Sequence, residues 1–255
     1  MTVPSISLKG RNAIVTGGGD IGGAIARGLA SCGAKVEVWD SSRNVRDSFH
    51  SDGIETRDVD ITSMSKVNES MNLSWESHSQ IDILVNSAAV AIFGPVATMS
   101  SDDWTRTMDV NLTGVFLTCQ AFVKCCLITG IAGNIVNISS IGGLRGEADF
   151  SNYCASKFGV IGFGQSLARE VGEFGIRVNT VCPGAVESRM NTETMARDTK
   201  RTGESIEDVE KRILAKTALR RLVKPKDVAD AVIFLSSDLA SCITAETLSV
   251  TGGTF

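Results

Sequence analysis

The stretch Ala13–Ala30 reads AIVTGGGDIGGAIARGLA and decides the fold. Its first four residues form an apolar, β-branched run that is typical of a buried strand. A glycine-rich turn follows at residues 16–23, and small and apolar residues then continue as in a helix. Glycines allow a sharp turn and a close approach to a phosphate, and the start of a helix offers free N–H groups. The stretch therefore predicts a strand–turn–helix unit that binds the pyrophosphate of a dinucleotide.

Strand-like runs recur along the chain, with helix-like stretches between them. We expect strands at residues 13–16, 35–39, 55–59, 81–86, 134–139, 177–182 and 247–250. We expect helices near residues 21–32, 62–78, 101–129, 151–174 and 226–237. This alternation predicts an α/β fold: a Rossmann-type doubly wound parallel sheet of about seven strands in three α/β/α layers.

The chain carries no obvious linker or repeat, so we expect one domain over residues 1–255. The charged segment 190–217 interrupts the alternation after the end of a strand. Ligands of α/β sheets bind beyond the carboxyl ends of the strands, so this segment is expected to form a substrate lid. A plain surface loop or helix is the alternative.

Composition excludes several classes of protein. The formal net charge of −4 argues against a nucleic-acid partner, because such proteins are usually basic. No run reaches the ~18 consecutive apolar residues of a membrane span, and the N-terminus shows no signal-peptide pattern. The seven cysteines include no CxxC pair, which favours a reducing, cytoplasmic location. With only two histidines, a three-histidine metal centre is excluded, and we expect no bound metal.

An acid at the end of the second expected strand indicates which dinucleotide is bound. Asp40 ends the run VEVWD, and a carboxylate there accepts hydrogen bonds from ribose hydroxyls and repels a 2′-phosphate. NAD is therefore favoured as cofactor, with NADP as the less favoured alternative because Arg43 lies nearby. Asp20 brings a second negative charge into the glycine turn, close to the expected phosphates, unless it caps the following helix and points away.

The pattern Y-x-x-x-K at Tyr153 and Lys157 predicts a catalytic pair. Residues four apart share one face of a helix. A phenol has a pKa of ~10 and is a poor base at neutral pH, but a nearby ammonium and an oxidised nicotinamide lower that pKa. Ser140 ends the neighbouring strand and can hydrogen-bond the substrate oxygen; Ser139 is the alternative, one residue farther from Tyr153. Tyr153 is the only tyrosine in the chain.

These motifs resemble the short-chain dehydrogenase/reductase family over nearly the whole chain, from Leu8 to Thr251. The family motif T-G-x-x-x-G-I-G is similar to TGGGDIG here, which is one residue shorter. The resemblance implies catalytic roles for Asn111, Ser140, Tyr153 and Lys157, with Asn111 holding a water that links Lys157 to solvent. It implies cofactor contacts from Gly17, Asp20, Ile21, Asp40, Asp60, Ile61, Asn86, Ala88, Tyr153, Lys157, Pro183, Gly184, Val186 and Ser188. The pair Asp58-Val59 is a competing match for Asp60-Ile61.

The expected function is NAD-dependent interconversion of a secondary alcohol and a ketone by hydride transfer, on a polyol or sugar-like alcohol. The expected pocket wall mixes polar with apolar side chains: Ile92, Phe93, Gly142, Leu144, Glu147, Phe150, Asn152 and Met190. A 3-oxoacyl thioester reductase using NAD(P)H is the first alternative and suits the apolar members. A catalytically silent NAD-binding regulatory or scaffold protein is the second, because the glycine turn is short and Ala89 and Ala245 replace family glycines. The resemblance also implies a homotetramer or homodimer paired through the helices near 101–129 and 151–174.

Overall fold

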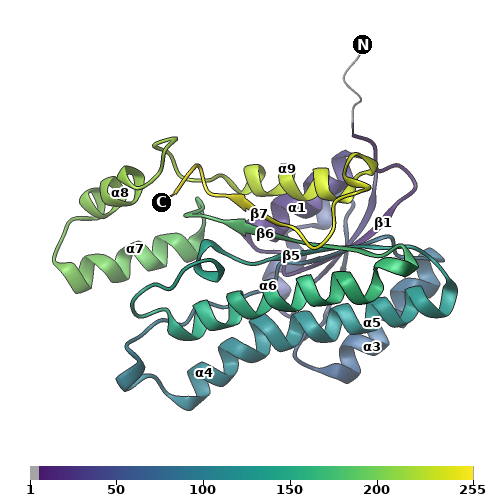
Figure 1. The fold of residues 1–255 in the computed structure, drawn as a ribbon, viewed down its shortest axis with the longest axis horizontal. Coiled ribbons are helices and arrows are strands. Elements are labelled where there is room, and N and C mark those ends of the chain that lie inside the picture. Colours follow the sequence, from purple (N-terminus) through teal and green to yellow (C-terminus); the bar gives the residue numbers. More distant parts are fainter. Residues whose placement is uncertain (1–5, 255) are drawn as a thin grey trace, which may run out of the picture.

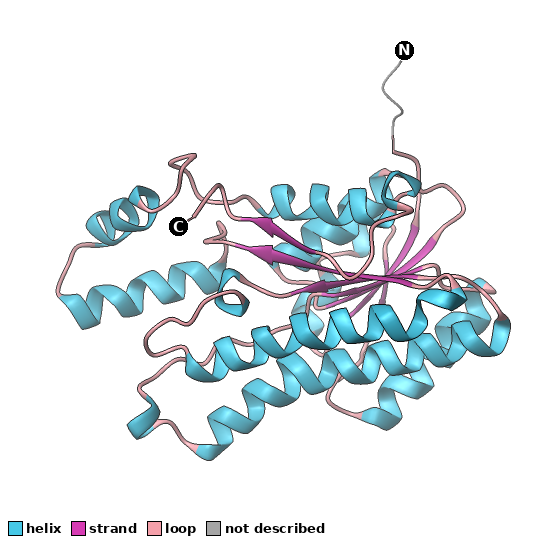
Figure 2. Cartoon of the chain, viewed as in Figure 1, coloured by secondary structure: helices cyan, strands magenta, loops and turns pink. Residues whose placement is uncertain are grey.

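The apolar runs of the sequence form seven parallel strands in one sheet (Figures 1 and 2). The computed structural model describes residues 6–254. The strands are β1 (Asn12–Thr16), β2 (Lys35–Trp39), β3 (Glu55–Arg57), β4 (Ile83–Asn86), β5 (Asn134–Ile138), β6 (Arg177–Pro183) and β7 (Thr247–Val250). Their spatial order is β3-β2-β1-β4-β5-β6-β7, and every pairing is parallel. The order reverses between β1 and β4, where sheets of this kind open a ligand crevice.

The sheet is covered on both faces by helices, which confirms the predicted three layers. Along β1, Ala13 and Val15 enter one hydrophobic core, while Ile14 enters the other. The first core is closed by α1 (Asp20–Ser31) and α9 (Pro225–Ser236), which contact each other. The second is closed by α3 (Met64–His78), α5 (Gly114–Thr129) and α6 (Ser151–Val171). Figure 1 shows α1 and α9 on one side of the sheet and α5 and α6 on the other.

The predicted helix at 101–129 is a continuous helical run with an irregular centre. It consists of α4 (Ser101–Met108), a π-helical turn (Asp109–Thr113) and α5. Such single π turns frequently occur at functional sites. Over residues 6–254, this is the one helix long and apolar enough to cross a membrane, and 44 % of its most apolar window is buried inside the protein. The buried residues of α5 pack against α3 and close the second core, whereas Phe116, Leu127 and Ile128 of the same helix are exposed.

The segment expected as a lid folds into two helices, α7 (Arg189–Thr202) and α8 (Ile206–Ala215), which extend beyond the sheet in Figure 1. The hydroxyl oxygen of Ser188 accepts a hydrogen bond from the Asn191 N–H and caps α7, and Ser205 caps α8 in the same way. Such caps satisfy backbone donors at a helix start. The short helix α2 (Arg43–Asp47) was likewise not among the expected helices.

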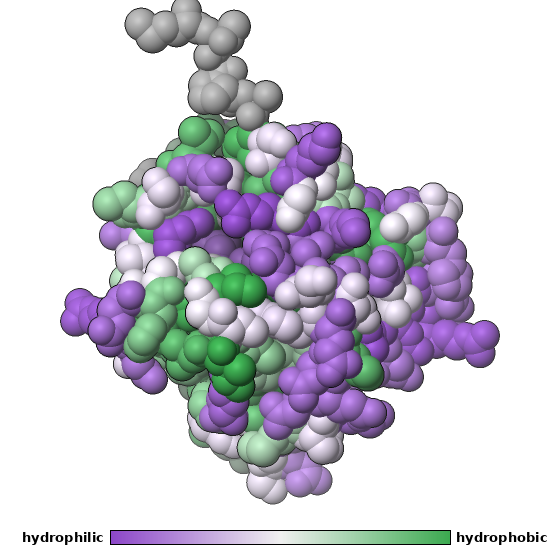
Figure 3. Space-filling model, turned by 90° about the vertical axis from the view of Figure 1, so that its right-hand side faces the viewer, coloured by the Kyte–Doolittle hydropathy of each residue, from purple (hydrophilic) through white to green (hydrophobic). Residues whose placement is uncertain are grey.

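The side of the molecule on which α5 and α6 end carries mixed polar and apolar side chains (Figure 3). Exposed apolar residues at these ends are Leu127, Ile128 and Phe174. They lie at the amino ends of the parallel strands, and therefore away from the carboxyl-end crevice.

Candidate active site

A cleft of about 1030 Å³ opens at the carboxyl ends of the strands, on both sides of the point where their order reverses. The turn after β1, the ends of β2, β4 and β5, and the start of α7 contribute to its wall. Ten of the predicted cofactor residues line it: Gly17, Asp20, Ile21, Asp40, Asp60, Ile61, Ala88, Tyr153, Lys157 and Ser188. The structure therefore brings these ten residues together at one site from six separate segments of the sequence.

Four predicted cofactor residues do not line the cleft within residues 6–254: Asn86, Pro183, Gly184 and Val186. The Asn86 side chain is buried, accepts a hydrogen bond from Thr118 Oγ1 at 2.7 Å and donates to Asn137 Oδ1 at 2.9 Å. Gly184 packs closely against Thr251, where an added Cβ would lie 3.0 Å from the Thr251 Cα. In this structure the Asn86 side chain belongs to a buried network that joins β4 and β5 to α5.

The short glycine turn keeps the geometry of a strand–turn–helix unit. Gly17 has a left-handed backbone, with φ +75°, and a Cβ there would lie 2.5 Å from the Cα of Ala88. A Cβ on Gly22 would lie 1.7 Å from the carbonyl oxygen of Gly17. By contrast, a Cβ on Gly19 would meet nothing within 4 Å, although Gly19 lines the cleft. Close packing of the turn is combined with open space on its cleft side, which fits a bound pyrophosphate.

The Asp20 carboxylate crosses to the lid segment. Asp20 is the first residue of α1, and its Oδ2 accepts a hydrogen bond of 2.8 Å from the backbone N–H of Arg189, the first residue of α7. Its side chain does not cap α1, since Gly19 occupies the N-cap position. The expectation that Asp20 caps its own helix is therefore wrong: the carboxylate joins the starts of two helices.

Asp40 is held rigidly at the end of β2. Its Oδ2 accepts a hydrogen bond from the Gly18 N–H and its Oδ1 from the Ser42 N–H, both at 2.8 Å. Arg43 points outward, 86 % exposed, 3.6 Å from Asp47. The cation beside Asp40 is instead Arg46, which donates to the Asp40 carbonyl oxygen at 2.7 Å. Sequence reasoning missed Arg46, because a helix as short as α2 has too little periodicity to predict.

The two acids between β3 and α3, Asp58 and Asp60, differ in their position relative to the cleft. Asp58 forms an ion pair of 3.2 Å with Arg46 and is not a cleft residue among those described. Asp60 lines the cleft, and hydrogen bonds from the Thr62 hydroxyl and backbone N–H lower the pKa of its carboxyl. The geometry therefore favours Asp60-Ile61 over Asp58-Val59.

Tyr153 and Lys157 project from the same face of α6 into the cleft. The Lys157 Nζ lies 5.8 Å from the centroid of the Tyr153 ring and donates to the Ile138 carbonyl oxygen at 3.0 Å. The Ser140 hydroxyl lies near enough to the Tyr153 phenol to lower the pKa of that phenol, and it also accepts a hydrogen bond of 3.1 Å from the Gly142 N–H. Ser139 instead donates its hydroxyl to the Lys157 carbonyl oxygen at 2.8 Å. Ser140, rather than Ser139, is therefore the serine that faces the phenol.

Burial sets the protonation of this pair. Removal from water raises the pKa of Tyr153, although the Ser140 hydroxyl opposes the change. Removal from water also lowers the pKa of Lys157 to about 8. The expected lowering of the phenol pKa is not found in the protein alone, because desolvation disfavours a buried phenolate more than the surrounding groups stabilise it. At neutral pH the phenol is protonated and the amine is largely charged.

Asn111 is fully buried in the π-helical turn. Its Oδ1 accepts a hydrogen bond from the Val90 N–H at 2.8 Å, and its Nδ2 donates to the Val90 carbonyl oxygen at 2.9 Å and to Ser156 Oγ at 3.2 Å. The π turn therefore positions an amide that holds the loop after β4 against α6, one residue before Lys157.

Of the eight residues expected in the substrate wall, Ile92 and Met190 line the cleft, and the other six are not among its lining within residues 6–254. Phe93 and Phe150 stack with ring centroids 4.1 Å apart, and both contact the Tyr153 ring edge-on at 5.9 and 6.4 Å. Asn152 is fully buried and uses its amide on the Ile92 carbonyl oxygen, Thr107 Oγ1 and the Tyr153 N–H. Its polar groups therefore stabilise the start of α6 and are not available to a ligand.

Across residues 6–254, no three His, Cys, Asp or Glu side chains are grouped so that they could hold a metal ion. All seven cysteines are free thiols, and burial raises the pKa of Cys119 and Cys126 to about 12. Such thiols are unreactive small apolar residues.

Comparison with known proteins agrees with this geometry. Residues 18–254 match the family model described as enoyl-(acyl carrier protein) reductase. The chain is 35 % identical to a 3-oxoacyl-(acyl-carrier-protein) reductase of Chlamydia pneumoniae, over 97 % of this chain and 98 % of that protein. It is 36 % identical to the reductase of that name from Salmonella typhimurium, over 98 % and 99 % of the two chains.

Two solved structures share the fold over nearly the full length. Actinorhodin polyketide ketoreductase, solved with NADPH, has a TM-score of 0.91 and 33 % identity, covering 95 % of this chain and 96 % of its own. NAD⁺-bound xylitol dehydrogenase has a TM-score of 0.90 and 27 % identity, covering 96 % and 99 % of the two chains. With the family match over most of its length, this chain belongs to the short-chain dehydrogenase/reductase family and is an oxidoreductase that interconverts CH–OH and ketone groups with a nicotinamide cofactor.

Proposed function

We propose that the protein reduces 3-oxoacyl thioesters with NADH. The observation that carries this substrate class is the likeness to 3-oxoacyl reductases over nearly the full length of the chain. The apolar side chains of Ile92 and Met190 in the cleft lining suit an acyl chain. A polyol or sugar-like alcohol, expected from the polar wall residues, is less well supported. The Asn152 amide uses its hydrogen bonds within the protein, and Glu147 is exposed on the surface.

The choice of NADH rests on Asp40. Its carboxylate is fixed by two backbone N–H groups at the end of β2 and lines the cleft. A 2′-phosphate brought there would meet this negative charge, whereas a ribose diol can donate hydrogen bonds to it. Arg46 offers little compensation, since its guanidinium is already engaged with the Asp40 carbonyl oxygen and with Asp58.

The proposed chemistry assigns a proton to Tyr153. When bound, the reduced cofactor supplies a hydride to the carbonyl carbon. Tyr153 donates its phenolic proton to the carbonyl oxygen, and the raised pKa of the phenol keeps that proton available at neutral pH. The Ser140 hydroxyl lies near the phenol and, we propose, holds the substrate oxygen beside it. The Lys157 ammonium stabilises the phenolate that remains, and Asn111 holds a water through which solvent restores the proton.

A substrate comparison tests the proposal. Reduction of an acetoacetyl thioester should be rapid with NADH as the donor. The same reduction should be much slower with NADPH. The same protein should reduce NAD⁺ poorly with a panel of polyols and sugar alcohols. Faster turnover of a polyol would overturn the substrate class and favour the dehydrogenase alternative. Tight NADH binding without turnover of any alcohol or ketone would favour a catalytically silent binding protein.

We further propose that residues 1–255 act as one domain, with α7 and α8 as a substrate lid, in a homotetramer or homodimer in the cytoplasm. Phe116 on α5 and Phe158 on α6 are 40 % and 46 % exposed, which supports pairing through these two helices. Seven free thiols suit a reducing compartment. Light scattering of the intact protein measures the assembly, and a monomer at micromolar concentration would contradict it.

A further inference from the structure

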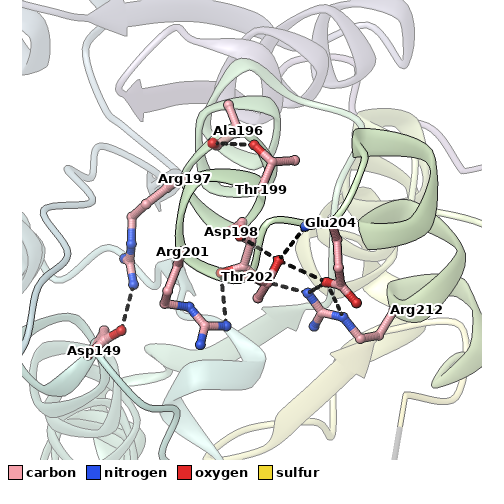
Figure 4. A network of polar contacts seen from close by, with 9 residues as sticks. All are labelled: Asp149, Ala196, Arg197, Asp198, Thr199, Arg201, Thr202, Glu204 and Arg212. Carbon is pink, nitrogen blue, oxygen red and sulfur yellow. Dashed lines mark hydrogen bonds and ion pairs between the residues drawn. The ribbon is translucent and has the colours of Figure 1, made fainter.

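The lid segment is linked to Tyr153 through Arg197 and two phenylalanines. Arg197 lies in the middle of α7, and its Nη2 forms an ion pair of 3.1 Å with Asp149, which lies in the loop before α6 (Figure 4). Asp149 has a left-handed backbone, with φ +66°, and its carbonyl oxygen accepts a hydrogen bond from the Gly94 N–H at 2.9 Å. Arg197 therefore joins α7 to a site where the loops after β4 and β5 already meet.

The guanidinium of Arg197 covers the aromatic wall from outside. Its Cζ lies 5.3 Å from the ring centroids of both Phe93 and Phe150. Both rings contact Tyr153 edge-on. A cation over the face of an aromatic ring is attracted by the ring's quadrupole, more strongly where water is excluded. The lid, the two phenylalanines and the proposed proton donor form three successive layers.

The Arg197 guanidinium makes its contacts within the protein rather than in the cleft. Its Nη1 is buried and has no hydrogen-bond partner among residues 6–254, and Arg197 is not one of the residues that line the cleft there. An arginine can pair with a carboxylate at one edge while its flat face stacks on rings, which a lysine ammonium cannot reproduce. These features favour a structural link to Tyr153 over a direct contact with a ligand.

We infer that Arg197 is a positioning residue: by pairing with Asp149 and stacking on Phe93 and Phe150, it fixes the orientation of the Tyr153 phenol when the lid is seated. The inference deepens the proposed function, because it rests on Tyr153 as the proton donor. This role accounts for the contacts of Arg197 with two loops at once: the loop after β5, through Asp149, and the loop after β4, through Phe93.

The kinetic test uses four variants and a control in the full-length protein. Arg197→Met keeps an apolar contact with the rings but removes the charge and the ion pair, and Asp149→Asn keeps a residue that tolerates a left-handed backbone. Each should lower kcat about tenfold, because small misplacements of a reacting group are costly, while the NADH dissociation constant stays unchanged. The double variant should be no slower than the slower single variant, because both changes break one link. Arg197→Lys should recover only part of kcat.

Arg201→Met is the matched control. Arg201 lies one turn later on α7 and pairs with Asp198 at 3.5 Å (Figure 4). Loss of that pair leaves Arg197 in place, and α7 stays joined to α8 through Arg212, which pairs with Asp198 at 3.2 Å and Glu204 at 3.0 Å. The control should keep the kcat of the unaltered protein.

A second readout needs no substrate. Because Tyr153 is the only tyrosine, a protein labelled with 3-fluorotyrosine gives a single ¹⁹F resonance from the proposed proton donor. Arg197→Met and Asp149→Asn should shift or broaden this resonance, and Arg201→Met should not. If the unaltered protein turns over no thioester, the proposed function fails while the resonance still tests the link.

Three results would overturn the inference. The first is an unchanged ¹⁹F resonance in Arg197→Met. The second is a raised KM for the thioester at unchanged kcat, which would make Arg197 a substrate-binding residue. The third is a double variant whose loss of kcat is the product of the two single losses, which would show that Arg197 and Asp149 act independently.

Discussion

At the residue scale, the protonation of Tyr153 and Lys157 follows from burial. The cleft withholds water from both groups, which raises the pKa of the phenol and lowers the pKa of the amine. A protonated phenol suits a reductase, since the acid must arrive with its proton. At alkaline pH, we expect deprotonation of the Lys157 ammonium to limit the rate of the reaction.

This argument predicts the alkaline limb of the pH profile. The pKa of Lys157 is lowered to about 8, so its ammonium is present below pH 8 and lost above it. The kcat/KM for thioester reduction should therefore fall as pH rises through about 8, because the phenolate formed by proton donation loses its stabilising charge. Initial rates from pH 6 to 10 at saturating NADH measure the limb. A profile that stays flat to pH 10 would mean that Lys157 is not the group responsible.

At the element scale, the starts of α1 and α7 face each other across the cleft and share the Asp20 carboxylate. A helix start attracts anions, so the pyrophosphate of the cofactor and the Asp20 carboxylate compete for the same positive region. Asp20 joins the lid segment to the glycine turn, and we expect its charge to lower the affinity for the cofactor.

Asp20→Asn separates these two effects. The amide oxygen can still accept the hydrogen bond from the Arg189 N–H, but the negative charge is gone. We expect NADH to bind about fivefold tighter, with a weaker dependence on salt, because repulsion between exposed charges is modest and screened. Fluorescence titration of NADH measures this, with Asp198→Asn on the far part of α7 as the control. Weaker binding to Asp20→Asn would show that the carboxylate assists the cofactor instead.

The same elements show how far sequence reasoning extends. Apolar runs and the Y-x-x-x-K spacing predict the sheet, its layers and the faces of α6, because periodicity and chain order determine them. The direction of the Asp20 side chain and the position of Arg197 depend on contacts between segments more than 45 residues apart, for which a single sequence has no local signal. Asn86 and Asn152 show the reverse case. Asn86 was expected at the cofactor and Asn152 in the substrate wall, but tertiary packing uses both side chains inside the core.

At the scale of the whole molecule, the sheet assembles three functions from distant parts of the chain. In the proposed account, Asp40 and Asp60 contact the cofactor from one half, Tyr153 supplies the proton beside Ser140 from the other, and Arg197 of the lid segment positions Tyr153. The central claim is that this assembly reduces a ketone with Tyr153 as its acid.

The measurement that tests this claim most directly compares Tyr153→Phe with the unaltered protein, using NADH and an acetoacetyl thioester. The substitution removes the phenolic hydroxyl, which is the proton donor, but keeps the ring against Phe93 and Phe150. The kcat should therefore fall by roughly 10²- to 10⁴-fold, the usual contribution of a general acid. The NADH dissociation constant should change little. Turnover of Tyr153→Phe within a few-fold of the unaltered protein, with NADH binding intact, would contradict the account.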